Sequence, residues 1–553
     1  MNRGVWRALA LVAAVGAARL AWCDSLPLVR NFERRLHPDT VVERDVEGLE
    51  QRIQSGKLRL NLRAFLALLL KNSTGILLTQ LDVYTAAEAV TSAKAPFDPQ
   101  LLLGFSAERS VQQEASQTSG AASLSDLTQA STASYSQVLG AGPTLTAGFT
   151  ATRASSNSAF NFYNPSVATG LSFTVTQPLL QNRGNLQLRA PLMVARTELR
   201  IVTEQSQAQI ATSIASAASQ YWEAIRAREN VRVLEQSLDL ARKSYERDRQ
   251  ALELGALSKL DILQSQSQVA QRKLDLIQGQ YAYRQALDGL RQSIGADLKP
   301  NTRAMEIVLE DDPRETPAGF HALPLEEALA KARRDRPELS AAGRRVGVDE
   351  LNARVARNQM TPRLDLSLQG GSSGLGGNQL PVVLPLSQGG GTTSLVPGGL
   401  GDSLNQLFGF SAPYYGFSLT LGIPVRSSAA QASLTDALVN RVRDRYSQRQ
   451  TDQQVILDVE SANSQLELAQ VSVEAARASR DLSQQNVDAE QMKYQLGTVT
   501  AFELLTAQSQ LATAESSVVN AYVNYQKAVV AYRRAIWTTL DDLGFVFESP
   551  KAH

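Results

Sequence analysis

The sequence predicts a mixed α/β membrane protein whose chain contains two structural repeats, each with short strands followed by a long helical hairpin. Three observations indicate this fold class. Two stretches, 192–254 and 425–496, contain neither glycine nor proline. The residues that follow each stretch are alike in the two halves of the chain. Upstream of each stretch, short segments alternate between apolar and polar residues, which is the pattern of strands with one apolar face.

Composition excludes several classes of function. The 553 residues carry 55 Lys and Arg against 54 Asp and Glu, and this balance does not favour a nucleic-acid surface. The single cysteine, Cys23, and the three histidines, His37, His321 and His553, are scattered along the chain. Their spacing forms no zinc site and places no nucleophile beside a base. We therefore expect neither an enzyme nor a metal or other cofactor.

The N-terminus has the features of a secretory signal peptide, which we assign to residues 1–23. Arginines precede the apolar stretch 8–18, as such signals require. Residues 20–23 are similar to a lipoprotein processing box, so Cys23 is a candidate for lipidation, although the bulky Trp22 stands where a small residue is expected. The alternative is ordinary cleavage just after Cys23 or further upstream.

Beyond the leader and an N-terminal extension at 24–57, no run of about 18 apolar residues follows that could form a membrane-spanning helix. In lipid, only helices and closed barrels satisfy every backbone polar group. We therefore expect any membrane crossing to be a β-barrel, which points to the outer membrane of a Gram-negative cell.

Each stretch without proline predicts one very long helix. These helices occupy 191–254 and 424–496, and at about 1.5 Å per residue each would be on the order of 100 Å long. Apolar residues, many of them alanine, recur at alternating steps of four and three along 455–476 and 507–535. This spacing is typical of a narrow coiled-coil seam.

The tips of both hairpins carry the same types of capping residue. In each half a glycine can act as the left-handed C-cap of the incoming helix, a hydroxyl residue as the N-cap of the outgoing helix, and an acid as its third residue. These are Gly255, Ser258 and Asp261 in the first half and Gly497, Thr500 and Glu503 in the second. The acids offset the helix dipole, and capping alone remains an alternative to any further role for them.

Strict two-residue alternation predicts four strands. They lie at about 100–108 and 169–178 in the first half and at about 363–369 and 414–424 in the second. The segment 143–152 also alternates and is either another strand or an extracellular extension. The low-complexity segments 112–136 and 370–409 are expected to be external loops.

Four or five strands cannot close a barrel with a usable bore, because about eight strands are needed before the interior merely fills with side chains. Several chains must therefore share one barrel.

These features together make the sequence similar to the outer-membrane efflux protein family, the TolC-like channels. The resemblance covers about 58–543 and depends on the order of several motifs, which occurs twice. The motifs are the tips 494–497 with 503–508 and 254–255 with 261–263, the helices 62–93 and 325–357 followed by Pro99 and Pro362, and the strand ends 177–179 and 423–425.

The resemblance implies a homotrimer in which each protomer gives four strands to a twelve-stranded barrel in the outer-membrane lipid and its helices to a helical barrel in the periplasm. The first repeat is assigned to 58–296, an equatorial linker to 297–324, the second repeat to 325–543 and a C-terminal tail to 544–553. The implied function is the passive exit duct of a tripartite efflux or type I secretion system. Its partners would be a periplasmic adaptor protein and an inner-membrane pump of the RND, ABC or MFS type.

The resemblance also implies roles for the tips. Glu503 falls where an acid of the constricting ring is found, and the next ring position is Thr506. Asp261 and Tyr494 match a pair that links neighbouring hairpins, while Val499 replaces the arginine of that network. The adaptor would contact Leu254, Gly255, Ala256, Ser258, Leu496, Gly497, Thr498 and Thr500.

Two alternatives remain open for the sequence: a periplasmic adaptor-like protein and a coiled-coil scaffold, neither of them with a pore. Adaptors use one helical hairpin with β-domains, whereas this chain has two hairpins and alternating strands. The sequence does not reveal the cargo, the particular adaptor and pump, or whether the tips are closed at rest.

Overall fold

The computed structural model describes residues 48–49, 53–54, 56–113, 121–140, 142–158, 161–254, 259–315, 320–380, 398–496 and 498–539. The chain divides into two compact units, Met1–Arg52 and Ile53–His553, and the helices and strands reported below belong to the second unit. The predicted signal peptide with Cys23, most of the 24–57 extension and the 544–553 tail lie outside the described residues. The assignments made for them stay predictions.

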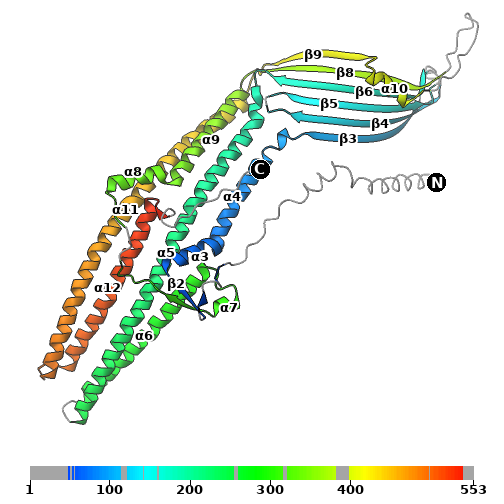
Figure 1. Ribbon diagram of the computed structural model, residues 1–553. Coiled ribbons are helices and arrows are strands. Elements are labelled where there is room, and N and C mark those ends of the chain that lie inside the picture. The colour runs from blue at the N-terminus through cyan, green and yellow to red at the C-terminus, as the bar shows by residue number, and fades with distance from the viewer. Residues whose placement is uncertain are drawn as a thin grey trace, which may run out of the picture. The chain divides into compact units, whose positions relative to one another are not determined.

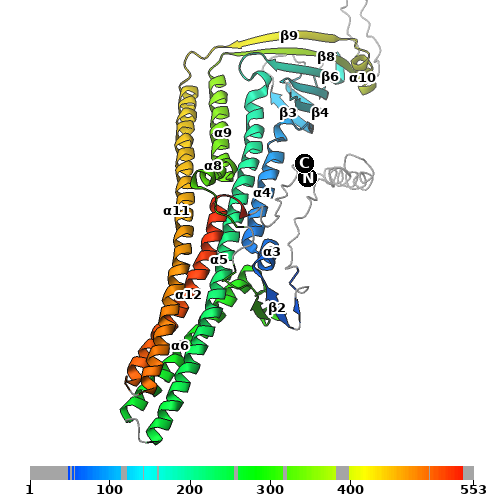
Figure 2. The ribbon, with the colours of Figure 1, turned by 60° about the vertical axis from the view of Figure 1, so that its left-hand side comes forward.

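Four long helices form two hairpins, whose tips lie at the end of this unit opposite the large sheet (Figures 1 and 2). The hairpins are α5 Leu186–Glu253 with α6 Lys259–Ser293, and α11 Ser428–Gln495 with α12 Ala501–Ala535. Both incoming helices have 68 residues and both outgoing helices have 35. A helix of that longer length extends about 100 Å.

A seam of small and branched apolar residues holds the second hairpin together. The buried residues of this cluster are Val455, Val459, Ala462, Leu466 and Ala469 of α11, and Ala528, Val529, Tyr532 and Ala535 of α12, with Ala328 and Ala332 of the helix α8. Alanine at so many of these positions lets the helix backbones approach closely. The α11 positions are those at which the sequence predicts a coiled-coil seam.

The helix expected at 62–93 is broken into α3 Leu62–Asn72 and α4 Thr74–Ser92, with Ser73 extended between them. No single helix among the described residues is both long and apolar enough to cross a membrane; Leu62–Asn72 and Thr74–Phe97, bent by 47°, meet those two criteria only as a pair.

The helix expected at 325–357 is likewise broken, into α8 Leu325–Asp335 and α9 Pro337–Gln359. The residue before a proline is disfavoured in the helical region, and Arg336 is accordingly extended, with φ −71° and ψ 123°. This explains why one continuous apolar pattern yields two helices.

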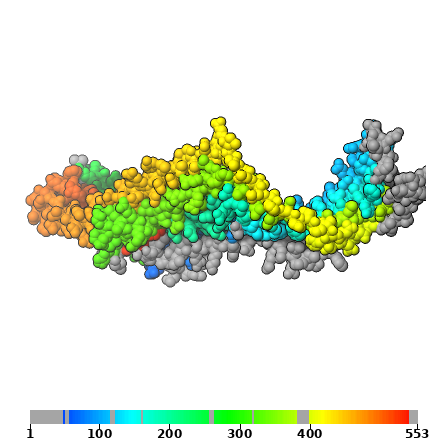
Figure 3. Space-filling model, turned by 90° about the horizontal axis from the view of Figure 1, so that it is seen from above, coloured from blue at the N-terminus to red at the C-terminus, as the bar shows by residue number. Residues whose placement is uncertain are grey.

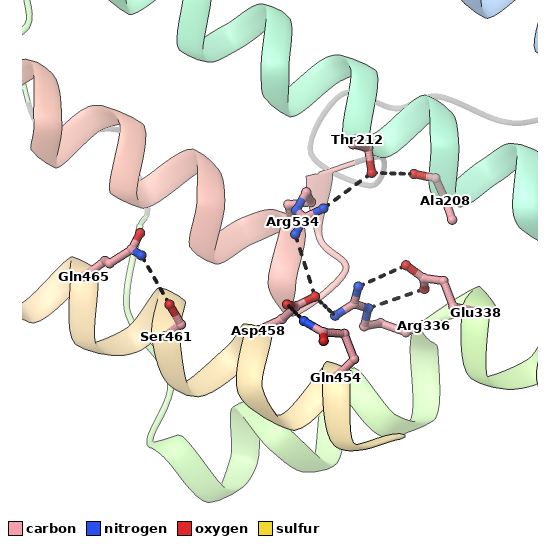
Figure 4. A network of polar contacts seen from close by, with 9 residues as sticks. All are labelled: Ala208, Thr212, Arg336, Glu338, Gln454, Asp458, Ser461, Gln465 and Arg534. Atoms are coloured by element: carbon pink, nitrogen blue, oxygen red, sulfur yellow. Dashed lines mark hydrogen bonds and ion pairs between the residues drawn. The ribbon is translucent and has the colours of Figure 1, made fainter. Parts of the chain in front are cut away.

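Arg336 also joins several helices at this break (Figure 4). Its side chain is 6% exposed and forms ion pairs with Asp458 of α11 at 3.1 Å and with Glu338 at 2.9 Å. Arg534 of α12 approaches Asp458 to 3.8 Å and Thr212 of α5 to 3.5 Å. A buried cation with two carboxylate partners therefore connects the break to α11, and through Asp458 to α12 and α5.

The large sheet has six antiparallel strands in the order β3-β4-β5-β6-β8-β9, where the sequence analysis expects four. The strands are β3 Gln100–Gln113, β4 Ser123–Val138, β5 Thr144–Ser156, β6 Tyr163–Pro178, β8 Arg363–Gln379 and β9 Pro413–Gly422. The segment 143–152, for which the sequence left two interpretations, thus belongs to a strand, β5. Seen from above, strands of both halves lie at the end away from the orange tip region (Figure 3).

The prediction of an external loop at 112–136 is wrong for most of this segment, because residues 123–136 belong to β4. This strand consists largely of Ser, Thr, Ala and Gln, so its two faces differ little in polarity and the alternation is weak. Only the hydrogen bonds to β3 and β5 reveal it as a strand.

The prediction of an external loop at 370–409 is also partly wrong. Strand β8 continues to Gln379, and the helix α10 Leu400–Phe408 packs on the sheet. The Ser403 hydroxyl donates to the carbonyl oxygen of Gly374 at 3.0 Å and lies 2.6 Å from the Thr169 hydroxyl. A Cβ at Gly374 would lie 2.0 Å from the Ser403 carbonyl oxygen, and one at Gly376 would lie 2.3 Å from the Gly399 carbonyl oxygen. The close approach of α10 therefore requires glycine at these two positions.

A second, small sheet lies beside the helices and has the order β1-β2-β7. Its strands are β1 Ile53–Gln54, β2 Lys57–Leu60 and β7 Glu306–Leu309, and β2 pairs with β7 in parallel. The short helix α7 Pro300–Arg303 precedes β7. Segments from the predicted linker 297–324 therefore pair with the start of the first repeat.

Two buried tyrosines connect the long helices to the middle segments. The Tyr221 hydroxyl of α5 lies 2.7 Å from Asp311 Oδ2 and 3.0 Å from the Leu60 carbonyl oxygen. Burial and the Asp311 carboxylate raise the pKa of Tyr221, so the hydroxyl stays protonated and remains a donor. In the second half, the Tyr532 hydroxyl accepts from the Leu323 backbone N–H at 2.9 Å.

Candidate functional site

The large sheet has one apolar face. Its strands are paired in register, so Phe105, Ser131, Ala151, Thr169 and Gly374 form one row across five strands. Residues two positions apart along a strand share a face. The face that contains Phe105 holds most of the large apolar residues, which are Leu101, Leu103, Phe105, Val111, Leu145, Phe149, Leu171, Phe173, Val175, Leu364, Leu366, Leu368, Tyr415, Phe417, Leu419 and Leu421.

The opposite face is polar and small. It holds mainly Ser, Thr and Gly, including Ser106, Thr132, Thr150, Gly170, Thr174, Ser367, Ser418 and Thr420. Its larger aliphatic residues are Leu102, Leu124, Val138 and Leu375. On the apolar face, Phe105 is 71% exposed and Phe417 76% exposed. Such a separation is typical of strands with lipid on one side and water on the other.

The tip of the second hairpin is held by a capping box. The Thr500 hydroxyl accepts from the Glu503 backbone N–H at 3.4 Å, and the Glu503 carboxylate accepts from the Thr500 backbone N–H at 3.1 Å. Each residue thus satisfies a helix-end donor of the other. Glu503 remains exposed, so its capping function leaves its charge accessible to water.

The other predicted tip residues are distributed as follows. Gly255, Ala256, Ser258 and Gly497 lie outside the described residues, as does the side chain of Asp261, whose backbone belongs to α6. Leu254 is 86% exposed and Leu496 79% exposed, so each tip presents an apolar side chain to its surroundings. Thr498 and Thr506 are exposed near them, and both hydroxyls donate to backbone carbonyls of their own hairpin.

Tyr494 connects the two hairpins near their tips. Its hydroxyl donates to Asp248 Oδ1 of α5 at 2.9 Å, and the guanidinium of Arg247 lies 4.9 Å from the centre of its ring. Asp248 is 1% exposed and also accepts from the Ser265 hydroxyl of α6. One buried carboxylate therefore joins three helices of both hairpins.

Asp248 is the tip residue that the sequence analysis missed. Leu238, Ala241, Ser244 and Asp248 are buried along one side of α5, with the spacing of a helix seam. A charged residue at a seam position was the available signal, since a buried carboxylate requires partners.

A groove runs between the outgoing helices α6 and α12 near the tips. Its volume is about 630 Å³, and it is lined by Leu263, Gln264, Ser267, Gln268, Gln271 and Arg272 of α6 and by Phe502, Leu505, Thr506 and Ser509 of α12. The Phe502 ring is 62% exposed at its edge. The lining of the groove thus combines apolar side chains with amides, hydroxyls and one cation.

Basic and acidic groups are mixed at the tip of the second hairpin. Lys493 forms an ion pair with Glu490 at 2.7 Å. The Glu490 carboxylate raises the pKa of Lys493, and Glu503 adds to this effect. The negative potential at Glu503 is therefore partly balanced by a lysine of its own hairpin.

The fold and the site define a class of protein: a membrane channel subunit with a two-faced strand wall at one end and long helical hairpins at the other. The sequence profile of the outer membrane efflux protein family matches residues 129–296 and 328–536. The chain belongs to this family.

Solved structures agree with the family. A membrane protein from Pseudomonas aeruginosa has a TM-score of 0.59 and 18% identity over 86% of this chain and 93% of its own. The CmeC outer membrane channel of Campylobacter jejuni has a TM-score of 0.60 and 13% identity over 91% of this chain and 94% of its own. The outer membrane protein VceC of Vibrio cholerae has a TM-score of 0.59 and 15% identity over 86% of this chain and 95% of its own. At these identities the likeness shows the fold alone, and no curated protein sequence matches the chain.

Membership of this family confirms the resemblance found in the sequence. The protein is an efflux channel of the outer membrane, and proteins of this family are channels rather than enzymes. The two alternatives without a pore, an adaptor-like protein and a coiled-coil scaffold, are therefore excluded.

Proposed function

We propose that the protein is a homotrimer and acts as the outer-membrane exit duct of a tripartite efflux or type I secretion system. Cargo would pass passively from an inner-membrane pump of the RND, ABC or MFS type, through a periplasmic adaptor and this duct, to the exterior. The observation that carries the proposal is the two-faced sheet, whose edge strands β3 and β9 have no further strand beside them among the described residues. Unpaired strand edges seek further strands, and a single copy has too few strands to enclose a bore.

The hairpin tips form the periplasmic entrance in this proposal. Glu503 and Thr506 would face the pore axis, where three copies of Glu503 concentrate negative potential and favour cations. Asp261 remains a candidate for a link between hairpins. The hydrogen bond between Tyr494 and Asp248 supports a role of Tyr494 in such a link, here within one protomer.

The adaptor would bind at the tips and in the groove between α6 and α12. The exposed side chains of Leu254, Leu496 and Phe502 support this assignment, because exposed apolar groups surrounded by a polar rim are typical of protein-binding surfaces. Gly255, Ala256, Ser258, Gly497, Thr498 and Thr500 are the remaining proposed contact positions.

A photo-crosslinking amino acid at Thr498 tests the proposal in living cells. Gln450, an exposed residue in the sheet-proximal third of α11, is the matched control. We expect a periplasmic protein to be captured from Thr498 and not from Gln450. Capture from neither position, with the protein present in outer-membrane fractions, would contradict the tripartite assignment.

A further inference from the structure

Among the described residues, the first half of the chain contributes to the large sheet a hairpin that has no counterpart in the second half. Strands β3 and β6 are not neighbours, because β4 and β5 lie between them. Every residue of β3 from Gln100 to Gln113 has a partner in β4, and β5 is paired with β4 on one side and with β6 on the other. The inserted hairpin therefore spans the same height as the strands beside it.

The faces of the sheet also continue across this hairpin. Phe149 of β5 lies between Ala133 of β4 and Leu171 of β6 on the apolar face. Thr150 of β5 lies between Thr132 and Gly170 on the polar face. A flap outside the wall would not need to match the two faces of the wall.

The turn that joins β4 to β5 is fixed at the junction with the helices. Leu139 N–H donates to the Pro143 carbonyl at 2.9 Å, and Gly142 N–H donates to the Leu139 carbonyl at 3.0 Å. The Asn185 side chain, which is 5% exposed at the start of α5, donates to the Leu139 carbonyl at 3.2 Å. One residue of the segment that leads β6 into α5, Asn185, therefore holds this turn.

The edge strands are suited to pairing between copies. An antiparallel sheet with an even number of strands has edge strands of opposite direction, so β3 of one copy can pair in antiparallel fashion with β9 of the next. Adding two strands preserves this relation, whereas adding one would not. The insertion of a whole hairpin is thus compatible with a closed ring of copies.

We propose that three copies close a barrel of eighteen strands, six from each chain, instead of the twelve that the family resemblance implies. This inference rests on the proposed trimer. Since barrel diameter grows roughly linearly with strand number, the bore would be about one and a half times as wide and about twice as large in cross-section.

The alternative arrangement has the β4–β5 hairpin outside the barrel wall, with β3 and β6 paired directly. The two arrangements predict different neighbours for Ser106 of β3. In the six-stranded sheet its partner is Ala130 of β4, and Ala168 of β6 lies three strand spacings away, which is about 14 Å. In the alternative, β6 is the neighbour of β3, and residues level with Ser106 come within reach of a disulfide.

Cysteine pairs in the full-length protein in outer membranes separate these arrangements. The pair Ser106→Cys with Ala130→Cys should form a disulfide on mild oxidation, because a bridge requires Cα atoms less than about 7 Å apart. The matched pair Ser106→Cys with Ala168→Cys should remain at the level of the single variant Ser106→Cys. Efficient bridging of the second pair without the first would overturn the eighteen-stranded barrel.

A separate pair tests the trimer itself. Leu103→Cys on β3, combined in turn with cysteine at Phe417, Leu419 or Leu421 of β9, should give a reducible covalent trimer at one register. Both barrel sizes predict this product, so its absence contradicts the proposed trimer rather than the strand number. Cryo-electron microscopy of unmodified trimers provides the second measurement: eighteen strands in cross-section support the inference, and twelve overturn it.

Discussion

The two halves of the chain have matching helices but different strands. Both hairpins combine a 68-residue helix with a 35-residue helix. In the part of the chain that the structure describes, the first half contributes four strands to the large sheet and the second half two. The tips of both hairpins must reach the same level if they are to form one entrance, and this fixes helix length. Strand number has only to preserve the antiparallel alternation, so a hairpin can be added to one half.

The broken helices of the two halves differ in the same way. The break at Ser73 has no side-chain capping bond, while the break at Arg336 contains a buried cation with two carboxylate partners. Similar backbone geometry is therefore stabilised by different chemistry. Substitutions at equivalent positions of the two halves can therefore be compared by their effects on stability and on ion selectivity.

The largest difference is expected between the two breaks. Arg336→Ala leaves Asp458 in a part-buried site without its main partner, and breaking a buried pair in this way costs about 3 kcal/mol or more. Ser73→Ala should change the free energy of unfolding by about 0.5 kcal/mol or less. Urea unfolding of the detergent-solubilised protein, followed by helical circular dichroism, measures both. Equal losses would mean that the ion pairs contribute nothing specific to the second half.

A smaller difference is expected between the two buried tyrosines. Tyr221→Phe removes a hydrogen bond to the Asp311 carboxylate and should cost about 2 kcal/mol, because bonds to charged groups are the stronger ones. Tyr532→Phe removes a bond to a neutral backbone group and should cost about 1 kcal/mol. The same unfolding measurement applies, and a larger loss at Tyr532 would reverse the comparison.

The helices that lead into the strands, α4 and α9, should differ in how their contribution to folding stability depends on pH. The buried hydrophobic residues of α4 include Ile76, Val83 and Val90, whereas α9 buries Asp349. Burial raises the pKa of Asp349, and Asp444 of α11 raises it further. The folded chain therefore binds this proton more tightly than the unfolded chain, and stability falls as pH rises from about 4 through the raised pKa.

Asp349→Asn should remove that dependence. The variant is expected to have a higher melting temperature than the wild type at neutral pH, with the difference disappearing near pH 4, below the raised pKa. Thermal unfolding at a series of pH values measures this. A variant that is less stable at neutral pH would show that the carboxylate is favourable where it lies.

The smallest effect is expected at the tips. Glu503→Gln keeps the capping box, because glutamine can fill the same position, but removes three charges from a trimer. Lys493 already balances part of this charge, so cation selectivity should fall by about twofold or less, given screening by salt. Reversal potentials of the reconstituted pore under a salt gradient measure the change. Asp261→Asn provides the counterpart in the first half, and unchanged potentials in both variants would remove the acids from the selectivity mechanism.

The amino-acid sequence was sufficient to predict the long helices and the α/β class. Stretches without glycine and proline, a repeated seam and the paired capping residues are local signals, and local signals can be read one helix at a time. Strands with large apolar residues, such as β3 and β9, were visible for the same reason. The family resemblance also followed from the order of these local features.

The number of strands and the partners of the buried polar groups depend on tertiary contacts and could not be predicted from the sequence. Strand β4 consists mostly of Ser, Thr, Ala and Gln, so its hydrogen bonds to the neighbouring strands, rather than its own alternation, identify it as a strand. Asp248 and Tyr494 are 246 residues apart, and Arg336 and Asp458 are 122 apart. Contacts over such separations depend on how the helices pack together, and no local pattern encodes them.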